Sequence, residues 1–160
     1  MDAGSAGPDD LLGGLSRRVL DCVQANVFVA DPKLTIVYMN PKAATTMATI
    51  AVDVQKAFRV SLDQVIGGSI HRFHQDPARV ERILHNPGFQ PHDVAVSFGA
   101  VTLGIYINRV TTADGAIAGY VVAWADITEK KAAADRAHAM ASRLAETREV
   151  SARVQSVASA

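Results

Sequence analysis

This chain of 160 residues has very little cysteine and no net charge at neutral pH. Lys and Arg together number 16, as do Asp and Glu, so no basic surplus favours nucleic acid or an anionic membrane as a partner. Cys22 is the only cysteine, which excludes an internal disulfide and suits a reducing cytoplasm. No apolar run approaches the ~18 residues of a membrane span, and the acidic first residues differ from a signal peptide. We therefore expect a cytoplasmic protein without a membrane span.

Motifs for catalysis and for a protein-only metal site are also lacking. The chain has no glycine-rich phosphate loop, no Gly-x-Ser-x-Gly and no paired carboxylates near its histidines. Cys22 and the scattered His85, His92 and His138 do not have the spacing of zinc ligands. We therefore expect a binding module rather than an enzyme.

The length and composition are those of one ordinary globular domain with helical extensions. Hydrophobic residues make up 49% and charged residues 20%, which argues against disorder. We expect a flexible lead over residues 1–8, an N-terminal helix over 9–24, a central domain over 25–128 and a C-terminal helix over 129–160.

β-branched and aromatic residues around a turn signal predict two strands near the start of the domain, and alternating apolar residues predict a meander of three more in the second half. The expected strands cover residues 26–31, 34–39, 92–98, 101–111 and 117–125. Asn40-Pro41 and Asp76-Pro77 each combine a favoured N-cap with a favoured first helical residue, so they start helices between the strands. The expected fold class is α+β, with a five-stranded antiparallel sheet and short helices on one face.

The last thirty residues predict a long helix that is too extended to pack on so small a domain throughout. Apolar side chains in it step by three and four, which is typical of a partial coiled-coil seam. This seam comprises Met140, Leu144, Thr147, Val150, Val154 and Val157. Together with the N-terminal helix it favours a homodimer.

The segment from Gly68 to Pro77 carries the side chains with coordination chemistry, His71 and His74. They are three residues apart, so on a short helix they would project to neighbouring positions. One reading is a core histidine bonded to a backbone carbonyl beside a surface histidine. The other is a metal ligand, because a single imidazole suffices for an iron that a porphyrin already holds.

The order of elements resembles a PAS domain over about residues 24–130, ending at Asp126-Ile127-Thr128. The segment Phe73-His-Gln-Asp-Pro77 and Trp124 in the last strand are similar to PAS domains attached to methyl-accepting chemotaxis receptors. The resemblance implies b-type haem held by a histidine of this segment, and dioxygen held by the strand tryptophan.

Residue by residue, the resemblance implies His74 as the iron ligand, with His71 as the alternative. Trp124 would donate its indole N–H to the bound gas. The other expected cofactor contacts are Leu103, Ile105, Val122 and Phe73. Candidate partners for the haem propionates are Arg72, Arg79, His92 and Arg109.

The resulting hypothesis is a haem-based dioxygen sensor domain that passes its ligand state to the C-terminal helix. Carbon monoxide and nitric oxide are further expected ligands, and a chemoreceptor signalling domain with its chemotaxis kinase complex is the expected downstream partner. Two alternatives stay open: a redox-sensing PAS domain with FAD, and a cofactor-free PAS module that dimerises and relays signals. A flavin that needs a cysteine adduct is excluded, because Cys22 lies in the leading helix.

Overall fold

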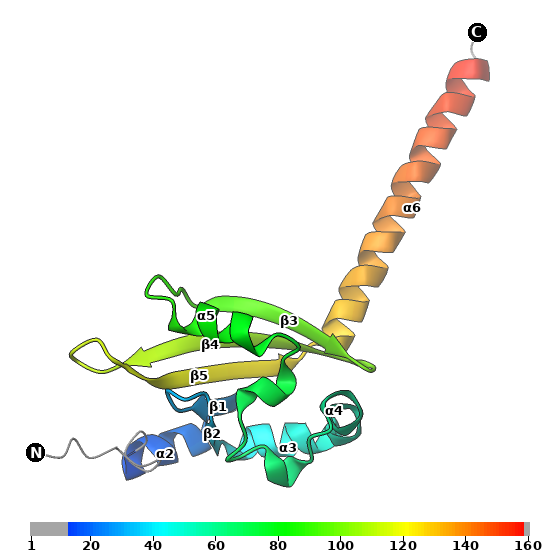
Figure 1. Ribbon diagram of the computed structural model, residues 1–160. Helices are drawn as coiled ribbons and strands as arrows, with labels where there is room; N and C mark the ends of the chain where they lie inside the picture. The colour runs from blue at the N-terminus through cyan, green and yellow to red at the C-terminus, as the bar shows by residue number, and fades with distance from the viewer. Residues whose placement is uncertain (1–12, 159–160) are drawn as a thin grey trace, which may run out of the picture. The chain divides into compact units, whose positions relative to one another are not determined.

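The computed structural model describes residues 13–158, which contain one five-stranded antiparallel sheet (Figure 1). The strand order is β2-β1-β5-β4-β3. The strands are β1 (Asn26–Ala30), β2 (Ile36–Met39), β3 (His92–Phe98), β4 (Val101–Thr111) and β5 (Ile117–Asp126). This arrangement confirms the predicted α+β class and antiparallel sheet. The first strand lies beside the last, so a pair that is distant in sequence joins the two parts of the open sheet.

The helices begin largely where the sequence predicts. They are α2 (Gly14–Asp21), α3 (Pro41–Thr49), α4 (Ala51–Phe58), η1 (Leu62–Gln64), η2 (Ile70–Phe73), α5 (Pro77–His85) and α6 (Thr128–Ala158). Asn40 caps α3 and Asp76 caps α5, each by accepting a backbone N–H three residues on. The predicted flexible lead (1–8) and the first residues of the N-terminal helix (9–12) lie outside the described residues.

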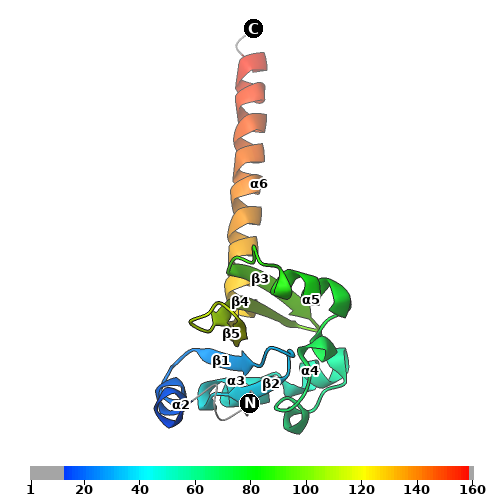
Figure 2. The same ribbon diagram turned by 60° about the vertical axis from the view of Figure 1, so that its left-hand side comes forward.

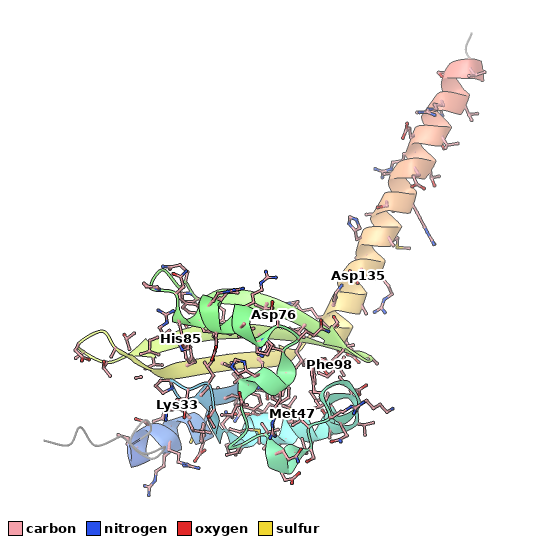
Figure 3. The ribbon with its side chains drawn as sticks, viewed as in Figure 1. Lys33, Met47, Asp76, His85, Phe98 and Asp135 are labelled. Atoms are coloured by element: carbon pink, nitrogen blue, oxygen red, sulfur yellow. The ribbon has the colours of Figure 1, made fainter. Side chains whose placement is uncertain are left out.

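One face of the sheet forms the main core with α3, α4 and the short turns that follow. Met47 of α3 and Trp124 of β5 belong to the same buried cluster, and Phe98 of β3 packs against it (Figure 3). A second cluster lies under α5, where Leu84 packs with Leu34 and Tyr120. Period-two alternation therefore places Tyr120 and Trp124 on the same inner face of β5.

The opposite face of β1 and β2 is covered by α2, which Figures 1 and 2 both show close to these strands. Leu20 packs against a buried cluster that contains Val27, Val29 and Tyr38. The Tyr38 hydroxyl donates to Asp21 Oδ1 at 2.6 Å. Burial, and then this bond to a carboxylate, raise the pKa of Tyr38 to about 12. Tyr38 therefore acts as a neutral donor that fixes the end of α2.

Asn40 joins α2, β1 and α3 through a fully buried side chain. Its Nδ2 lies 2.9 Å from the carbonyl oxygen of Ala25 and 3.2 Å from those of Leu20 and Val23. Its Oδ1 accepts from the backbone N–H groups of Val27 and Ala43, both at 3.0 Å. A single carboxamide therefore satisfies backbone groups of three elements.

Two side chains of the sheet hold the C-terminal end of α5. The Tyr120 hydroxyl donates to the Leu84 carbonyl oxygen at 3.0 Å, and burial raises the pKa of this tyrosine. Arg109 Nη2 donates to the same carbonyl and, at 2.6 Å, to that of Asn86. Its guanidinium also lies over the Phe89 ring, 4.7 Å from the centroid. A cation at a helix C-terminus satisfies carbonyls that have no partner within the helix.

The helix α6 forms a compact unit of its own, with the division after Asp126. It has 31 residues and buries none of them. Its side chains form ion pairs one turn apart, Lys131 with Asp135 at 3.1 Å and Glu149 with Arg153 at 2.7 Å. The apolar side chains of the predicted seam are exposed, and they include Met140, Leu144, Val150, Val154 and Val157. In the described part of the chain, no helix has the length and apolar content that a membrane span requires.

Candidate ligand-binding site

Backbone hydrogen bonds hold the histidine segment against β2. The N–H of Gly67 donates to Ile36 O at 2.7 Å, and the N–H of Ile36 donates to Gly68 O at 2.9 Å. The N–H of Ile70 then donates to Leu34 O at 2.9 Å. Gly67 has φ +81°, a left-handed conformation that glycine adopts without cost. The double glycine thus turns the chain so that η2 starts at a fixed place beside the sheet.

His74 lies just beyond η2 and not within it. The short helix is a 3₁₀ turn that ends at Phe73, and His74 follows in extended conformation, with φ −125° and ψ 138°. The expectation that both imidazoles share one helix face therefore does not hold. The ring of His74 is exposed, and its Nδ1 lies 2.7 Å from the carbonyl oxygen of Ile70. A carbonyl bond at Nδ1 fixes the ring and leaves Nε2 as the nitrogen that could coordinate a metal.

His71 lies within η2 and is half-buried. Its Nε2 is 3.4 Å from Glu81 Oε1 on α5, and its backbone N–H donates to Ser69 Oγ at 3.2 Å. Its Nδ1 is buried and has no hydrogen-bond partner in the part of the chain that the structure describes. His71 and His74 therefore each have one ring nitrogen close to a protein oxygen and one without a hydrogen-bond partner in the described residues.

Trp124 lies on the inner face of β5, near its C-terminal end, with 5% of its surface exposed. Its ring lies 5.4 Å from that of Phe28, and Ile105 of β4 is its partner across the strand pair. Its Nε1–H is buried without a partner among residues 13–158. An unpaired buried donor costs about 1–3 kcal/mol, so this N–H is available to a ligand that brings an acceptor.

The other expected cofactor contacts gather around Trp124 and η2. Leu103 belongs to the same buried cluster as Trp124, and Ile105 and Phe73 pack against it. Val122 is half-buried and lies two residues before Trp124 on the inner face of β5. Phe73 also belongs to a group of aromatic rings. The ring centre of Phe58 lies 5.4 Å from that of Phe73 and 4.9 Å from that of Phe98.

The candidate propionate partners are dispersed. Arg72 and Arg79 are exposed, and Arg72 Nη1 donates to Gln64 O at 3.3 Å. Arg109 is committed to the carbonyl groups at the end of α5. The side chain of His92 lies outside the described part of the chain. Of the residues described, no group of three or more His, Cys, Asp or Glu could hold a metal ion.

The sequence did not identify two polar residues that lie beside Trp124. Asn26 at the start of β1 donates from Nδ2 to the Trp124 carbonyl oxygen at 3.0 Å. Thr46 of α3 donates from Oγ1 to Asn26 Oδ1 at 2.7 Å. The only sequence signal is a polar residue that begins an apolar strand, and its partners are 98 and 20 residues away. Pattern and spacing do not report such non-local pairs.

Comparison with known proteins finds a likeness in sequence and a likeness in fold. No protein-family model matches the chain. A segment of 116 residues is 28% identical to the methyl-accepting chemotaxis protein McpB of Pseudomonas aeruginosa. The match covers 71% of this chain but only 17% of McpB.

Solved structures share the architecture. The Aer2 receptor of Vibrio cholerae, described as a dual PAS-haem oxygen sensor, is similar with a TM-score of 0.59 and 24% identity, over 65% of this chain and 95% of that one. A light-oxygen-voltage domain studied with a flavin analogue has a TM-score of 0.50 and 19% identity, over 85% of this chain and 99% of that one. At these identities the likeness concerns the fold. The sheet order, the helices on its inner face and these neighbours show that the chain has a PAS fold.

Proposed function

We propose that this PAS domain is a haem-based sensor of a diatomic gas, most directly dioxygen, in a cytoplasmic chemoreceptor-type signal transducer. The observation that carries the proposal is the buried indole N–H of Trp124, which has no partner in the described chain and lies two residues before the end of β5. Ferrous haem, when bound, would supply an iron that takes up dioxygen, carbon monoxide or nitric oxide.

The residues around the site fit such a group. His74 has its Nδ1 on a backbone carbonyl, so its Nε2 is the proposed ligand, with the half-buried His71 as the alternative. Leu103, Ile105, Val122 and Phe73 would provide the apolar wall that keeps water from the cofactor. Trp124 would donate its Nε1–H to a gas ligand that carries partial negative charge, which relieves the unpaired donor.

We propose that a conformational change caused by ligand binding passes from Trp124 to α6, and that the chain acts as a parallel homodimer. Asp126 ends β5 only two residues after Trp124, so a shift of this tryptophan acts on the residues that lead into α6. The exposed apolar row of α6 and the exposed Leu15 and Val19 of α2 would pair with those of a second copy. A ligand that favours one of two helix arrangements then shifts their populations. A chemoreceptor signalling domain and the chemotaxis kinase complex are the proposed recipients.

The proposal is tested by sedimenting the purified, reduced protein. The sedimenting species is followed by the intense near-ultraviolet absorbance band of haem. We expect a red protein whose haem band moves with a species of twice the chain mass and shifts on addition of carbon monoxide. A yellow protein with flavin absorbance would instead support the redox-sensing alternative with FAD. A colourless dimer that does not take up haemin would support the cofactor-free relay module.

Removing the indole donor is expected to release dioxygen faster. In Trp124→Phe the ring remains but the N–H is lost, and we expect the dioxygen dissociation rate of the reduced, haem-loaded protein to rise about 5- to 30-fold. Trp124→Leu should behave similarly. The rate is measured by stopped-flow mixing of the dioxygen-equilibrated protein with dithionite. Carbon monoxide is less polar and serves as the internal control. An unchanged dioxygen rate in Trp124→Phe would remove Trp124 from ligand recognition.

A further inference from the structure

The backbone of Trp124 is anchored by a buried side chain from the neighbouring strand. Asn26 is the register partner of Trp124 in the antiparallel pair of β1 and β5, so both side chains lie on the same face of the sheet. The Asn26 carboxamide is buried, with 6% of the residue exposed, and its Nδ2 donates to the Trp124 carbonyl oxygen at 3.0 Å.

The second half of this carboxamide reaches α3. Thr46 Oγ1 lies 2.7 Å from Asn26 Oδ1, and because Nδ2 must donate to a carbonyl, Oδ1 is the acceptor of the threonine proton. The hydroxyl also lies 3.1 Å from the Lys42 carbonyl oxygen of its own helix, which is the longer of its two contacts. A continuous polar bridge therefore runs from α3 through Asn26 to the backbone of Trp124.

The indole itself has no comparable anchor. Because its Nε1 is without a partner in residues 13–158, only packing and the backbone set the direction of the ring. Packing comes from Phe28 and from a cluster that includes Met47, the residue next to Thr46 on α3. A change in the position of α3 would thus reach the indole through both the polar bridge and the apolar contact.

We propose that Thr46 and Asn26 are positioning residues that fix the backbone of Trp124 and thereby the direction of its indole N–H. This inference rests on the proposed function only in that Trp124 is taken as the group that reads the ligand. Removal of the Thr46 hydroxyl leaves the buried Asn26 oxygen unsatisfied and frees its carboxamide to rotate, so the Trp124 carbonyl loses a defined partner.

The adjacent Thr45 provides a matched control. Among the residues that the structure describes, its hydroxyl bonds only within its own helix, to the Pro41 carbonyl oxygen at 3.1 Å, and its side chain is exposed. Thr46→Val and Thr46→Ala are compared with Thr45→Val and Thr45→Ala, and Thr46→Ser retains the hydroxyl. Alanine is the better helix former, so the alanine pair stays folded even if the valine pair does not.

The indole of Trp124 is the readout, because the chain has one tryptophan and hence one indole ¹H–¹⁵N signal. In the full haem-free chain we expect this signal to shift and its hydrogen exchange to become about tenfold faster in Thr46→Val and Thr46→Ala. Thr46→Ser and both Thr45 variants should match the parent. In haem-loaded protein the same two Thr46 variants should release dioxygen faster, and Thr46→Ser should not.

Equal indole exchange in the Thr46 and Thr45 variants would overturn the inference. So would a uniform loss of protection across the whole sheet, because Thr46 would then only stabilise the fold. The indole signal is recorded without haem, so a protein that takes up no haem would refute the proposed function while the indole exchange still decides the role of Thr46.

Discussion

Replacing His74 by alanine is expected to give a folded protein that carries little haem. The ring is exposed, and the hydrogen bond that it makes within residues 13–158 joins Nδ1 to Ile70 O at 2.7 Å, so the substitution should change the free energy of unfolding by only about 0.5 kcal/mol. Loss of the proposed iron ligand should instead remove most of the haem. The ratio of haem absorbance to protein absorbance measures this, with urea unfolding as the check on stability.

His71→Ala is the companion variant, since it removes the neighbouring imidazole and its approach to Glu81. We expect it to keep most of its haem. Full haem content in His74→Ala together with loss in His71→Ala would transfer the ligand role to His71. Full haem content in both single variants would exclude either histidine as the essential ligand.

The largest effect on stability is expected for Asn40→Ala. The side chain is fully buried and its carboxamide contacts five backbone groups, so alanine leaves donors and acceptors of α2, β1 and α3 without partners. Each unsatisfied buried group is costly, and we expect the free energy of unfolding to fall by about 3–5 kcal/mol. Urea unfolding followed by circular dichroism measures it.

Asn108→Ala is the control for this substitution. Asn108 lies on β4, on the face opposite to Ile107 and Arg109, and within the described chain its side chain has no hydrogen-bond partner. Its replacement should alter stability by about 0.5 kcal/mol or less. A fall of less than about 1 kcal/mol in Asn40→Ala would contradict the view that this residue holds three elements together.

The strands and capped helices could be predicted because their signals are local. Alternation marked β3, β4 and β5, and Asn40-Pro41 and Asp76-Pro77 marked the starts of α3 and α5. The predicted N-cap role of Asn40 is confirmed, but its three contacts to carbonyls around α2 were not foreseen. They depend on how α2 packs, and an N-cap motif describes only the helix that it begins.

Within the candidate site, the residues involved were easier to predict than their burial, backbone conformation and hydrogen-bond partners. The register places Ile105 directly opposite Trp124, a pairing that the sequence did not distinguish from one with Leu103. The surroundings of the two histidines were not predictable, because a 3₁₀ turn ends one residue before His74 and changes its direction. Asn26 and Thr46 carry no periodic signal, and only the three-dimensional pairing of β1 with β5 and α3 brings them to Trp124.

The position of β1 beside β5 also governs when this domain can fold during synthesis. Asn26 leaves the ribosome 98 residues before its partner Trp124, which at about 5–20 residues per second is a delay of roughly 5–20 seconds. Throughout that interval the nascent β1–β2 hairpin presents one strand edge without its neighbour. Such an edge can recruit other chains, so chaperone protection of the growing polypeptide matters most before its last strand emerges.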